Sequence, residues 1–369
     1  MRAVTRPLGL FCLLLASNSA FADYQLNLAP GVTATSQNSY DIHQIVMWIC
    51  VVIGIVVYGA MTYSILNHTK SKNPKPATFD DNLTVEILWT VIPILILIGM
   101  AVPATSALLA MEDTSNSDMS IKVTGYRWKW HYDYVGEDVG YFSNLSTPKD
   151  QIKNKEAKGE NYLLEVDNMM VIPTGKKVRF LFTSNDVIHA WWVPAFGVKK
   201  DAIPGFINES WVKVDEPGIY RGQCAELCGA DHGFMPVVVE AKSPEDYVAW
   251  LDSKKSEAAA AAANSNKSFT MEELMANGET AYNTNCGACH QVTGEGIAGV
   301  FPAIKGSAIA TGPAIDHIKA VLHGINTGMP AFGPQLNDAD LAAIITYERN
   351  AWGNNKGDMV QPSDVKAAR

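Results

Sequence analysis

Residues 223–235 read QCAELCGADHGFM and place two cysteines, a histidine and a methionine in one short run. In an exported protein Cys224 and Cys228 could simply form a disulfide bond. His232 and Met235 follow closely, so thiolate, imidazole and thioether groups gather in one expected loop between strands. Soft ligands of these types are typical of copper sites with a weak axial methionine. The run therefore predicts a copper centre.

A further histidine bears on how many copper ions this loop could hold. One cysteine suffices for a single copper ion, whereas two cysteines can bridge two ions if a second imidazole arrives from another strand. His189, in SNDVIHAWWVP at an expected strand end, offers that imidazole. We expect no open coordination position at such a site, and hence no substrate bound to the metal.

A CxxCH pattern stands closer to the C-terminus, with Cys286, Cys289 and His290 as its reactive residues. Two thiols at this spacing followed by histidine indicate covalent attachment of a c-type haem, with His290 as the proximal iron ligand. A redox-active CxxC pair is the alternative. The adjoining histidine, the export signal and the helical surroundings favour the haem.

The sixth iron ligand should come from a later loop. Met329 lies in TGMPAFG, a turn rich in Gly and Pro that can bring a sulfur atom to the iron, whereas Met359 lies in a polar segment. We therefore expect Met329 to be the axial ligand. Met359, His317 and His323 are the alternatives.

The N-terminal part predicts export and membrane insertion. Residues 1–22 combine arginines, an apolar run and Ala-Phe-Ala, the pattern of a cleaved secretory signal. Uncharged apolar stretches then predict spans at about 43–67 and 86–111, each long enough to cross a bilayer, with a helical hairpin buried in a protein core as the alternative. Lysines in the loop between the spans should keep that loop cytoplasmic and both flanks periplasmic.

The remainder divides into two expected domains and a linker. Alternating apolar runs predict a β-sandwich or barrel without an interrupting helix, with strands at 121–134, 161–173, 176–184 and 232–242. Helical spacing after the linker predicts a small α domain. The expected boundaries are 23–112 for the hairpin, 113–252 for the β domain, 253–268 for a low-complexity tether, 269–356 for the α domain and 357–369 for a polar tail.

Several longer motifs resemble subunit II of the haem-copper cytochrome c oxidases. From the first span to about Trp250 they include VEILWTVIP, GYRWKWHY, LLEVDN, DVIHAWWVP, GVKKDAIPGFINES and GIYRGQCAELCGADHGFMPVVVE, in that order. The resemblance implies a transmembrane hairpin of two helices followed by an all-β, cupredoxin-like Greek-key barrel. Residues from about Phe269 to Trp352 resemble class I cytochromes c, which implies an all-α domain.

In the resembled family the cysteine loop holds a dinuclear copper centre called CuA. The resemblance implies ligation by five side chains and one backbone carbonyl, that of Glu226; the six residues are His189, Cys224, Glu226, Cys228, His232 and Met235. Two coppers bridged by two thiolates share one electron, so the change in bond lengths on reduction is small. Such a site is suited to fast electron transfer.

Further residues acquire roles through the same resemblance. Trp128 stands where the family receives electrons from cytochrome c, although Trp128 and Trp130 could both be packing aromatics. The side chain of Glu226 is implied to help hold a magnesium ion shared with subunit I, and Asp201 matches a segment at that border. Glu86 matches a glutamate near the mouth of a proton channel of subunit I; otherwise it is an ordinary interfacial carboxylate.

The resemblance implies a subunit of an aerobic respiratory cytochrome c oxidase with no oxygen site of its own. Electrons from cytochrome c or a quinol-cytochrome c reductase would pass through haem c and CuA to the haems of subunit I, where oxygen is reduced to water with proton pumping. The expected place is the bacterial inner membrane, with both redox domains periplasmic and subunits I and III as partners. The tether would hold the fused donor at a high effective concentration.

Two other functions are compatible with the motifs. An exported copper carrier or assembly protein would need a labile, exposed site and no haem. The electron-accepting subunit of a nitric or nitrous oxide reductase could share the copper loop, but Glu86 and the two-span hairpin favour an oxidase. The net charge of −9 argues against nucleic acid and favours basic partners.

Overall fold

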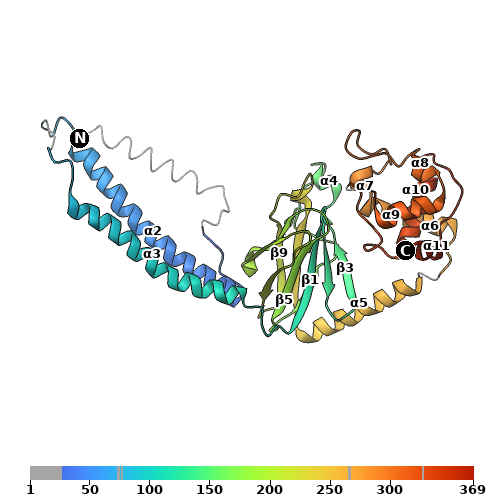
Figure 1. The fold of residues 1–369 in the computed structure, drawn as a ribbon, viewed down its shortest axis with the longest axis horizontal. Helices are drawn as coiled ribbons and strands as arrows, with labels where there is room; N and C mark the ends of the chain where they lie inside the picture. The colour runs from blue at the N-terminus through green and yellow to red at the C-terminus, as the bar shows by residue number, and fades with distance from the viewer. Residues whose placement is uncertain (1–26, 73–74, 76–77, 265–266, 326–327) are drawn as a thin grey trace.

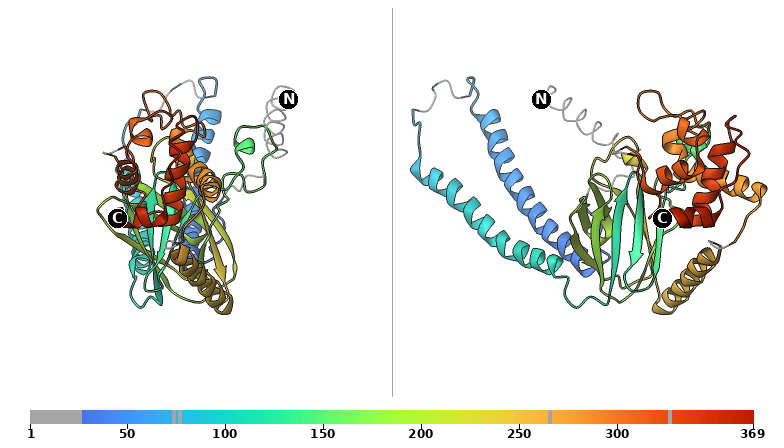
Figure 2. Two further views of the ribbon diagram at one scale, coloured as in Figure 1. Left: turned by 90° about the vertical axis from the view of Figure 1, so that its right-hand side faces the viewer. Right: turned by 45° about the vertical axis from the view of Figure 1, so that its right-hand side comes forward.

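The computed structural model describes residues 27–72, 75, 78–264, 267–325 and 328–369. The expected signal sequence at 1–22 lies outside these residues. Along the described chain, a pair of long helices, a β-sandwich and a helical C-terminal domain follow one another (Figure 1). The right-hand view of Figure 2 shows the sandwich between the other two parts.

The two N-terminal helices are α2 (Ala34–Asn67) and α3 (Leu83–Glu112). Each contains an 18-residue window with a mean hydropathy of 2.4, and none of either window is buried. By length and composition, both helices can cross a membrane. A hairpin in the core of a soluble domain would be mostly buried, so this exposure argues against the core-buried alternative.

The start of α2 is fastened to the sandwich. The hydroxyl of Thr33, the residue that caps α2, donates a hydrogen bond of 3.3 Å to the backbone carbonyl of Phe196. Thr33 also forms an antiparallel β-bridge with Val214. These contacts begin the helix at Ala34, earlier than the uncharged span alone predicts.

The sandwich consists of two five-stranded sheets. One sheet has the order β3-β2-β1-β5-β8, with β3 at Val139–Ser143, β2 at Lys129–Tyr134, β1 at Met119–Tyr126, β5 at Val178–Ser184 and β8 at Asn208–Val212. The other has the order β4-β10-β9-β6-β7, with β4 at Met170–Pro173, β10 at Pro236–Lys242, β9 at Gly218–Cys224, β6 at His189–Val193 and β7 at Val198–Ala202. β1 pairs with β5 and β10 with β4 in parallel, and the other neighbours are antiparallel.

The core of the sandwich lies between these sheets. Along β5 buried and partly buried residues alternate strictly, because successive side chains of a strand point to opposite faces. The rings of Phe180 and Phe182 lie 5.2 and 5.6 Å from that of Trp191 on β6, measured between centroids. All three side chains are fully buried, so the two sheets are joined by aromatic packing next to the first residue of β6.

The expected strands need four corrections. The run at 121–134 is divided by a turn into β1 and β2, and the run at 161–173 is extended only in β4. The run at 232–242 opens with the 3₁₀ turn η2 (His232–Phe234), and the helical turn α4 (Lys149–Ile152) interrupts the β domain, where we expected no helix. Alternating hydrophobicity does not distinguish a strand from a turn that buries the same side chains, which explains these errors.

The expected tether is largely helical. Helix α5 (Pro244–Asn264) begins on the sandwich, where Tyr247 and Leu251 are buried in its core, and continues through the alanine run. Alanine has the highest helix propensity, so the run extends a helix that packing has already started. The linker is therefore α-helical over most of its length.

The C-terminal domain is built around two packed helices, α6 (Met271–Asn285) and α10 (Asp338–Asn350). A Cβ atom at Gly278 of α6 would clash with the backbone carbonyl of Ala343 on α10, so only glycine permits this close approach. Shorter helices complete the domain, with α7 at Gly287–His290, α8 at Ala308–Thr311, α9 at Ala314–His323 and α11 at Pro362–Ala368.

The last residues are not a polar tail. Val360 and Val365 expose 1% and 0% of their surface in the core of the C-terminal domain. Arg369 donates hydrogen bonds to Asp338 and to the backbone carbonyl of Leu336. The expected tail at 357–369 is therefore a part of the α domain, because two buried valines, one before α11 and one within it, hold it against the core.

Candidate metal centre

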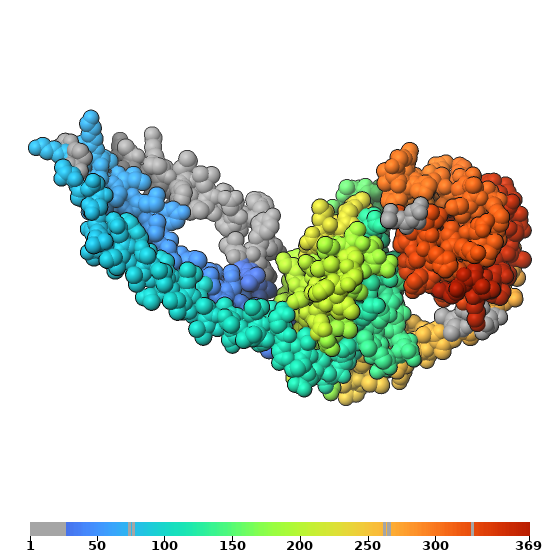
Figure 3. All heavy atoms as spheres, in the orientation of Figure 1, coloured from blue at the N-terminus to red at the C-terminus, as the bar shows by residue number. Residues whose placement is uncertain are grey.

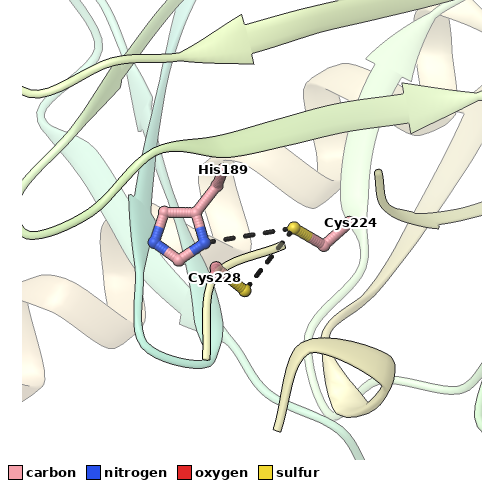
Figure 4. Close-up of side chains that lie close together, drawn as sticks. All are labelled: His189, Cys224 and Cys228. Carbon is pink, nitrogen blue, oxygen red and sulfur yellow. Dashed lines mark hydrogen bonds between the residues drawn. The ribbon is translucent and has the colours of Figure 1, made fainter. Parts of the chain in front are cut away.

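The loop cysteines and a histidine from β6 meet at one edge of the sandwich. His189 is the first residue of β6 and Cys224 the last of β9, and these strands are neighbours through the register Trp191↔Cys224. The Sγ atom of Cys224 lies 4.0 Å from His189 Nδ1 and 3.8 Å from Cys228 Sγ (Figure 4). The metal-binding atoms of these three buried residues all lie within 4.8 Å of one another.

The other expected ligands lie around this cluster. Cys228 Sγ is 3.6 Å from His232 Nδ1, so the two sulfur atoms have one imidazole on each side. The backbone carbonyl of Glu226 lies 3.4 Å from Cys224 Sγ. Met235 is buried, and its carbonyl accepts a hydrogen bond from the backbone N–H of Cys224. The structure therefore gathers both cysteines, both histidines and the Glu226 carbonyl, and it ties the backbone of Met235 to Cys224.

The two thiols are free rather than joined in a disulfide bond. Their separation of 3.8 Å is well beyond the length of a disulfide bond, about 2.05 Å. A hydrogen bond from the Cys228 thiol lowers the pKa of Cys224, and the same bond raises the pKa of Cys228. One sulfur thus readily becomes a thiolate, which is the form that binds metal.

Asp186 orients His189 and was missed in the sequence. Its carboxylate accepts a hydrogen bond of 2.9 Å from His189 Nε2, which leaves the Nδ1 lone pair facing Cys224. A carboxylate behind a histidine ligand commonly fixes the ring in this way. Asp186 stands three residues before His189 at the strand entrance, and that spacing was the signal available in the sequence.

Trp128 connects the surface to the metal-binding loop. It lies in the turn between β1 and β2, and its indole N–H donates a hydrogen bond of 3.3 Å to the backbone carbonyl of Cys228. Its ring packs against Gly229, where any Cβ would lie 3.1 Å from the ring. Trp130, by contrast, is fully buried in the core. Trp130 is thus a packing aromatic, whereas Trp128 both packs at the edge of the core and lies against the metal-binding loop.

The CxxCH residues lie on one short helix. Cys286 is the N-cap of α7 and Cys289 lies within it, and both are free thiols. His290 Nδ1 lies 2.8 Å from the carbonyl of Pro302, which only accepts, so Nδ1 carries the proton. The other nitrogen, Nε2, keeps its lone pair for a metal. This donor set fits a covalently bound haem with an imidazole ligand.

The candidates for the second axial ligand differ in their surroundings. Met329 is partly buried against the core of the C-terminal domain, whereas Met359 exposes 47% of its surface. His317 is buried and its Nε2 is 2.8 Å from a carboxylate oxygen of Glu348, while His323 is exposed. Among the candidates, Met329 thus combines a partly buried side chain with the absence of an ion pair such as the one His317 makes.

Three further acids lie away from the cysteine cluster or at its rim. Glu226 is exposed on the loop, so its carboxylate is accessible from outside the sandwich. Asp201 is exposed on β7, opposite Ala190 of β6. Glu86 is in the first turn of α3, at the other end of that helix from the sandwich. The structure places none of the three carboxylates within the buried metal-binding group.

Comparisons with known families match three parts of the chain. The family described as Cytochrome C oxidase subunit II, transmembrane domain, matches residues 22–106. The family described as Cytochrome C oxidase subunit II, periplasmic domain, matches residues 119–242. Residues 273–347 match the family described as Cytochrome C oxidase, cbb3-type, subunit III.

Individual relatives agree with these matches. A probable cytochrome c oxidase subunit 2 of Rickettsia felis is 39% identical over 251 residues, which are 67% of this chain and 78% of the relative. A cytochrome c oxidase subunit 2 of Phytophthora megasperma is 36% identical over 236 residues, 63% of this chain and 87% of the relative. The solved periplasmic domain of subunit II of cytochrome oxidase of Bradyrhizobium japonicum is 39% identical and covers 39% of this chain and 98% of its own, with a TM-score of 0.35.

Two apolar helices, a cupredoxin-like sandwich and a cytochrome c domain define a membrane protein with an extracellular redox portion. The chain belongs to the cytochrome c oxidase subunit II family, and it carries a fused cytochrome c domain. Its homologues are components of an oxidoreductase complex, and membership implies association with subunit I of a haem-copper oxidase. Copper and haem c are the cofactor classes that these domains imply.

Proposed function

We propose that this chain is the subunit of an aerobic respiratory cytochrome c oxidase that receives electrons at its own haem c and delivers them through a CuA centre to subunit I. The donor is cytochrome c or a quinol-cytochrome c reductase. Oxygen is reduced to water in subunit I with proton pumping, so the chain acts as an enzyme only within that complex. The chain spans the bacterial inner membrane, with both redox domains in the periplasm and subunit III as a further partner.

The observation that carries this proposal is the pair of free thiols between two imidazoles. The distances are 4.0 Å from His189 to Cys224, 3.8 Å between the sulfurs and 3.6 Å from Cys228 to His232. Two thiolates with an imidazole on each side would suit two copper ions, and Met235 and the Glu226 carbonyl would complete the ligand set. When bound, the copper pair supplies one-electron transfer with little change in bond lengths.

Trp128 then connects the surface of the sandwich to the proposed copper centre. The indole of Trp128 receives electrons at the turn between β1 and β2, and its hydrogen bond leads to the backbone of Cys228. Cys286 and Cys289 would attach the haem covalently, and His290 and Met329 would hold its iron. The tether removes the need for a diffusing partner at this step, because a fused donor has a high effective concentration.

Two carboxylates are proposed to act at the border with subunit I and within the membrane. The exposed side chain of Glu226 helps hold a magnesium ion shared with subunit I, since hard carboxylate oxygens suit magnesium. Glu86, in the first turn of α3, delivers protons toward a channel of subunit I. An acid at the end of a membrane span is suited to such a role.

The copper content of the full chain in detergent tests the central part of the proposal. We expect two copper ions per chain and a seven-line mixed-valence electron spin resonance signal. Cys228→Ser should remove that signal and leave at most one copper ion, because a single thiolate cannot bridge as two do. Cys50→Ser, on the exposed face of α2, is the matched control and should leave the signal intact. A Cys224–Cys228 disulfide in the copper-loaded chain would contradict the assignment.

Isolation of the native complex tests the oxidase function itself. We expect a haem-copper subunit I to co-purify and to consume oxygen when reduced cytochrome c is supplied. Reduction of nitric or nitrous oxide without oxygen consumption would instead assign the chain to another reductase. A copper-loaded chain that purifies without any partner and releases its copper readily would support a carrier.

A further inference from the structure

The cytochrome domain lies against the turn that carries Trp128. Figure 3 shows the orange and red domain in contact with the green part of the sandwich. The Cys289 thiol interacts electrostatically with Arg127 and Lys129 of this turn and with Asp231 of the copper loop. The haem-attachment face therefore faces the same surface from which Trp128 reaches the Cys228 carbonyl.

Lys129 lies inside this contact. Its ammonium group is 4.5 Å from the ring centroid of Phe142 on the sandwich and 5.6 Å from that of Phe332 on the cytochrome domain. Both distances are within the range of a cation–π interaction. The Lys129 ammonium thus contacts one aromatic ring on the sandwich and one on the cytochrome domain.

The charge of Lys129 is only partly compensated in the contact. The Cys286 and Cys289 thiols and two aspartates, 167 and 186, act on it through longer-range attraction, and burial outweighs that attraction. Burial therefore lowers the pKa of Lys129 to about 8, so the ammonium form still predominates at neutral pH. A positive charge is consequently held in a low-dielectric contact beside both cysteines that attach the haem.

We propose that Lys129 makes docking of the cytochrome domain depend on the oxidation state of the haem. This inference rests on the proposed function, since it requires the haem at Cys286 and Cys289. An oxidised haem carries one positive charge more than a reduced haem. Repulsion by the Lys129 ammonium is therefore weaker when the haem carries its electron, and the docked arrangement favours the reduced haem.

The consequence is a cycle of docking and release. A haem that passed its one electron to the copper pair would become more positive by one charge, and the Lys129 ammonium would then repel it more strongly. The contact then loosens, and the haem-attachment face, which docking covers, becomes available to the electron donor. By thermodynamic reciprocity, if reduction tightens docking, docking raises the haem midpoint potential by the same free energy.

The test is a redox titration of the haem in the full chain, loaded with copper and haem, at neutral pH. We expect Lys129→Met to lower the haem midpoint potential, by about 59 mV for each tenfold by which the docking constant of the reduced wild type exceeds that of the oxidised wild type. Lys129→Arg, which keeps the charge, should retain the wild-type potential. Lys122→Met is the matched control, because Lys122 is exposed on the neighbouring strand β1, and it should leave the potential unchanged.

Amide hydrogen exchange gives a second readout that does not depend on oxidase activity. In the wild type, peptides covering the turn at Arg127–Lys129 and the segment around Phe332 should exchange at least threefold more slowly in the reduced than in the oxidised protein. In Lys129→Met the two redox states should exchange alike. Equal exchange in both states of the wild type, or a potential in Lys129→Met equal to that of Lys122→Met, overturns this inference alone. A full chain that binds no covalent haem overturns the proposed function as well.

Discussion

At the scale of single residues, the site depends on partners that fix the orientation of each histidine. Asp186 accepts from His189 Nε2 and the carbonyl of Pro302 accepts from His290 Nδ1, so each ring presents its other nitrogen. The two rings therefore use opposite nitrogens for a metal. Neither partner belongs to the motifs that identify the ligands, although metal affinity depends on such groups.

Met329 is the proposed axial ligand of the haem iron, and its substitution tests that proposal directly. We expect Met329→Ala to keep the haem covalently attached through Cys286 and Cys289 but to convert it to a high-spin or misligated form with a lower midpoint potential. The physical reason is the loss of a soft sulfur ligand that favours reduced iron. Optical spectra and a redox titration of the full chain measure both effects.

Met359→Ala is the control for this prediction. Its side chain is exposed, so its removal should leave the spectrum unchanged. A high-spin spectrum in Met359→Ala together with a normal one in Met329→Ala would reverse the assignment.

At the scale of elements, the copper loop is held by two neighbouring strands of one sheet. The register Trp191↔Cys224 between β6 and β9 brings the first residue of β6 next to the last of β9. The backbone hydrogen bond from Cys224 to Met235 then closes the loop where β10 begins. Strand pairing thus positions His189 and Cys224, and the loop closed by this hydrogen bond carries Cys228 and His232.

The helix crossing in the cytochrome domain depends on one glycine. We expect Gly278→Ala to destabilise the domain by about 1–3 kcal/mol, since the new methyl group must push α6 away from Ala343 and Tyr347 of α10. Denaturant unfolding of the haem-loaded chain, followed through the haem absorbance, measures the change in unfolding free energy.

Gly287→Ala is the matched control in the same domain. A Cβ at Gly287 meets its nearest neighbour, the Tyr282 carbonyl, at 3.7 Å, which is ordinary van der Waals contact. This variant should stay within about 0.5 kcal/mol of the wild type. Equal stability of both variants would show that α6 and α10 adjust without cost.

At the scale of the whole molecule, the sandwich carries the membrane helices at one end and the cytochrome domain at the other (Figure 1). We expect Trp128→Phe to leave folding, copper content and haem content nearly unchanged while slowing electron transfer from haem to CuA at least about tenfold. That factor corresponds to about 1.4 kcal/mol of effective barrier. The reason is the loss of the indole N–H that connects the turn to Cys228. Flash reduction of the haem, followed at CuA, measures the rate.

Trp211→Phe is the control for this rate, since the indole of Trp211 donates to Ala110 at the membrane side of the sandwich. It should not slow the transfer. An unchanged rate in Trp128→Phe combined with a slower rate in a Tyr126 or Trp130 variant would place the receiving point elsewhere in the turn.

Much of the architecture was predictable because it depends on local patterns. Long uncharged runs predicted α2 and α3, and the loop from Cys224 to Met235 is so short that its ligands must gather wherever its ends are held. The CxxCH motif works in the same way, since one helical turn presents both thiols. Helical spacing likewise predicted a separate α domain, which the match to a cytochrome c family confirms.

The tertiary structure decided what depends on residues far apart in the chain. Packing of Tyr247 and Leu251 on the sandwich turned the expected tether into a helix, and burial of Val365 turned the expected tail into a part of the core. The approach of Asp186 to His189, and of Phe332 to Lys129, is likewise visible only in three dimensions. Spacing along the chain determines which side chains a loop can present. Burial and strand pairing arise only when distant segments meet, and they determine which groups those side chains contact.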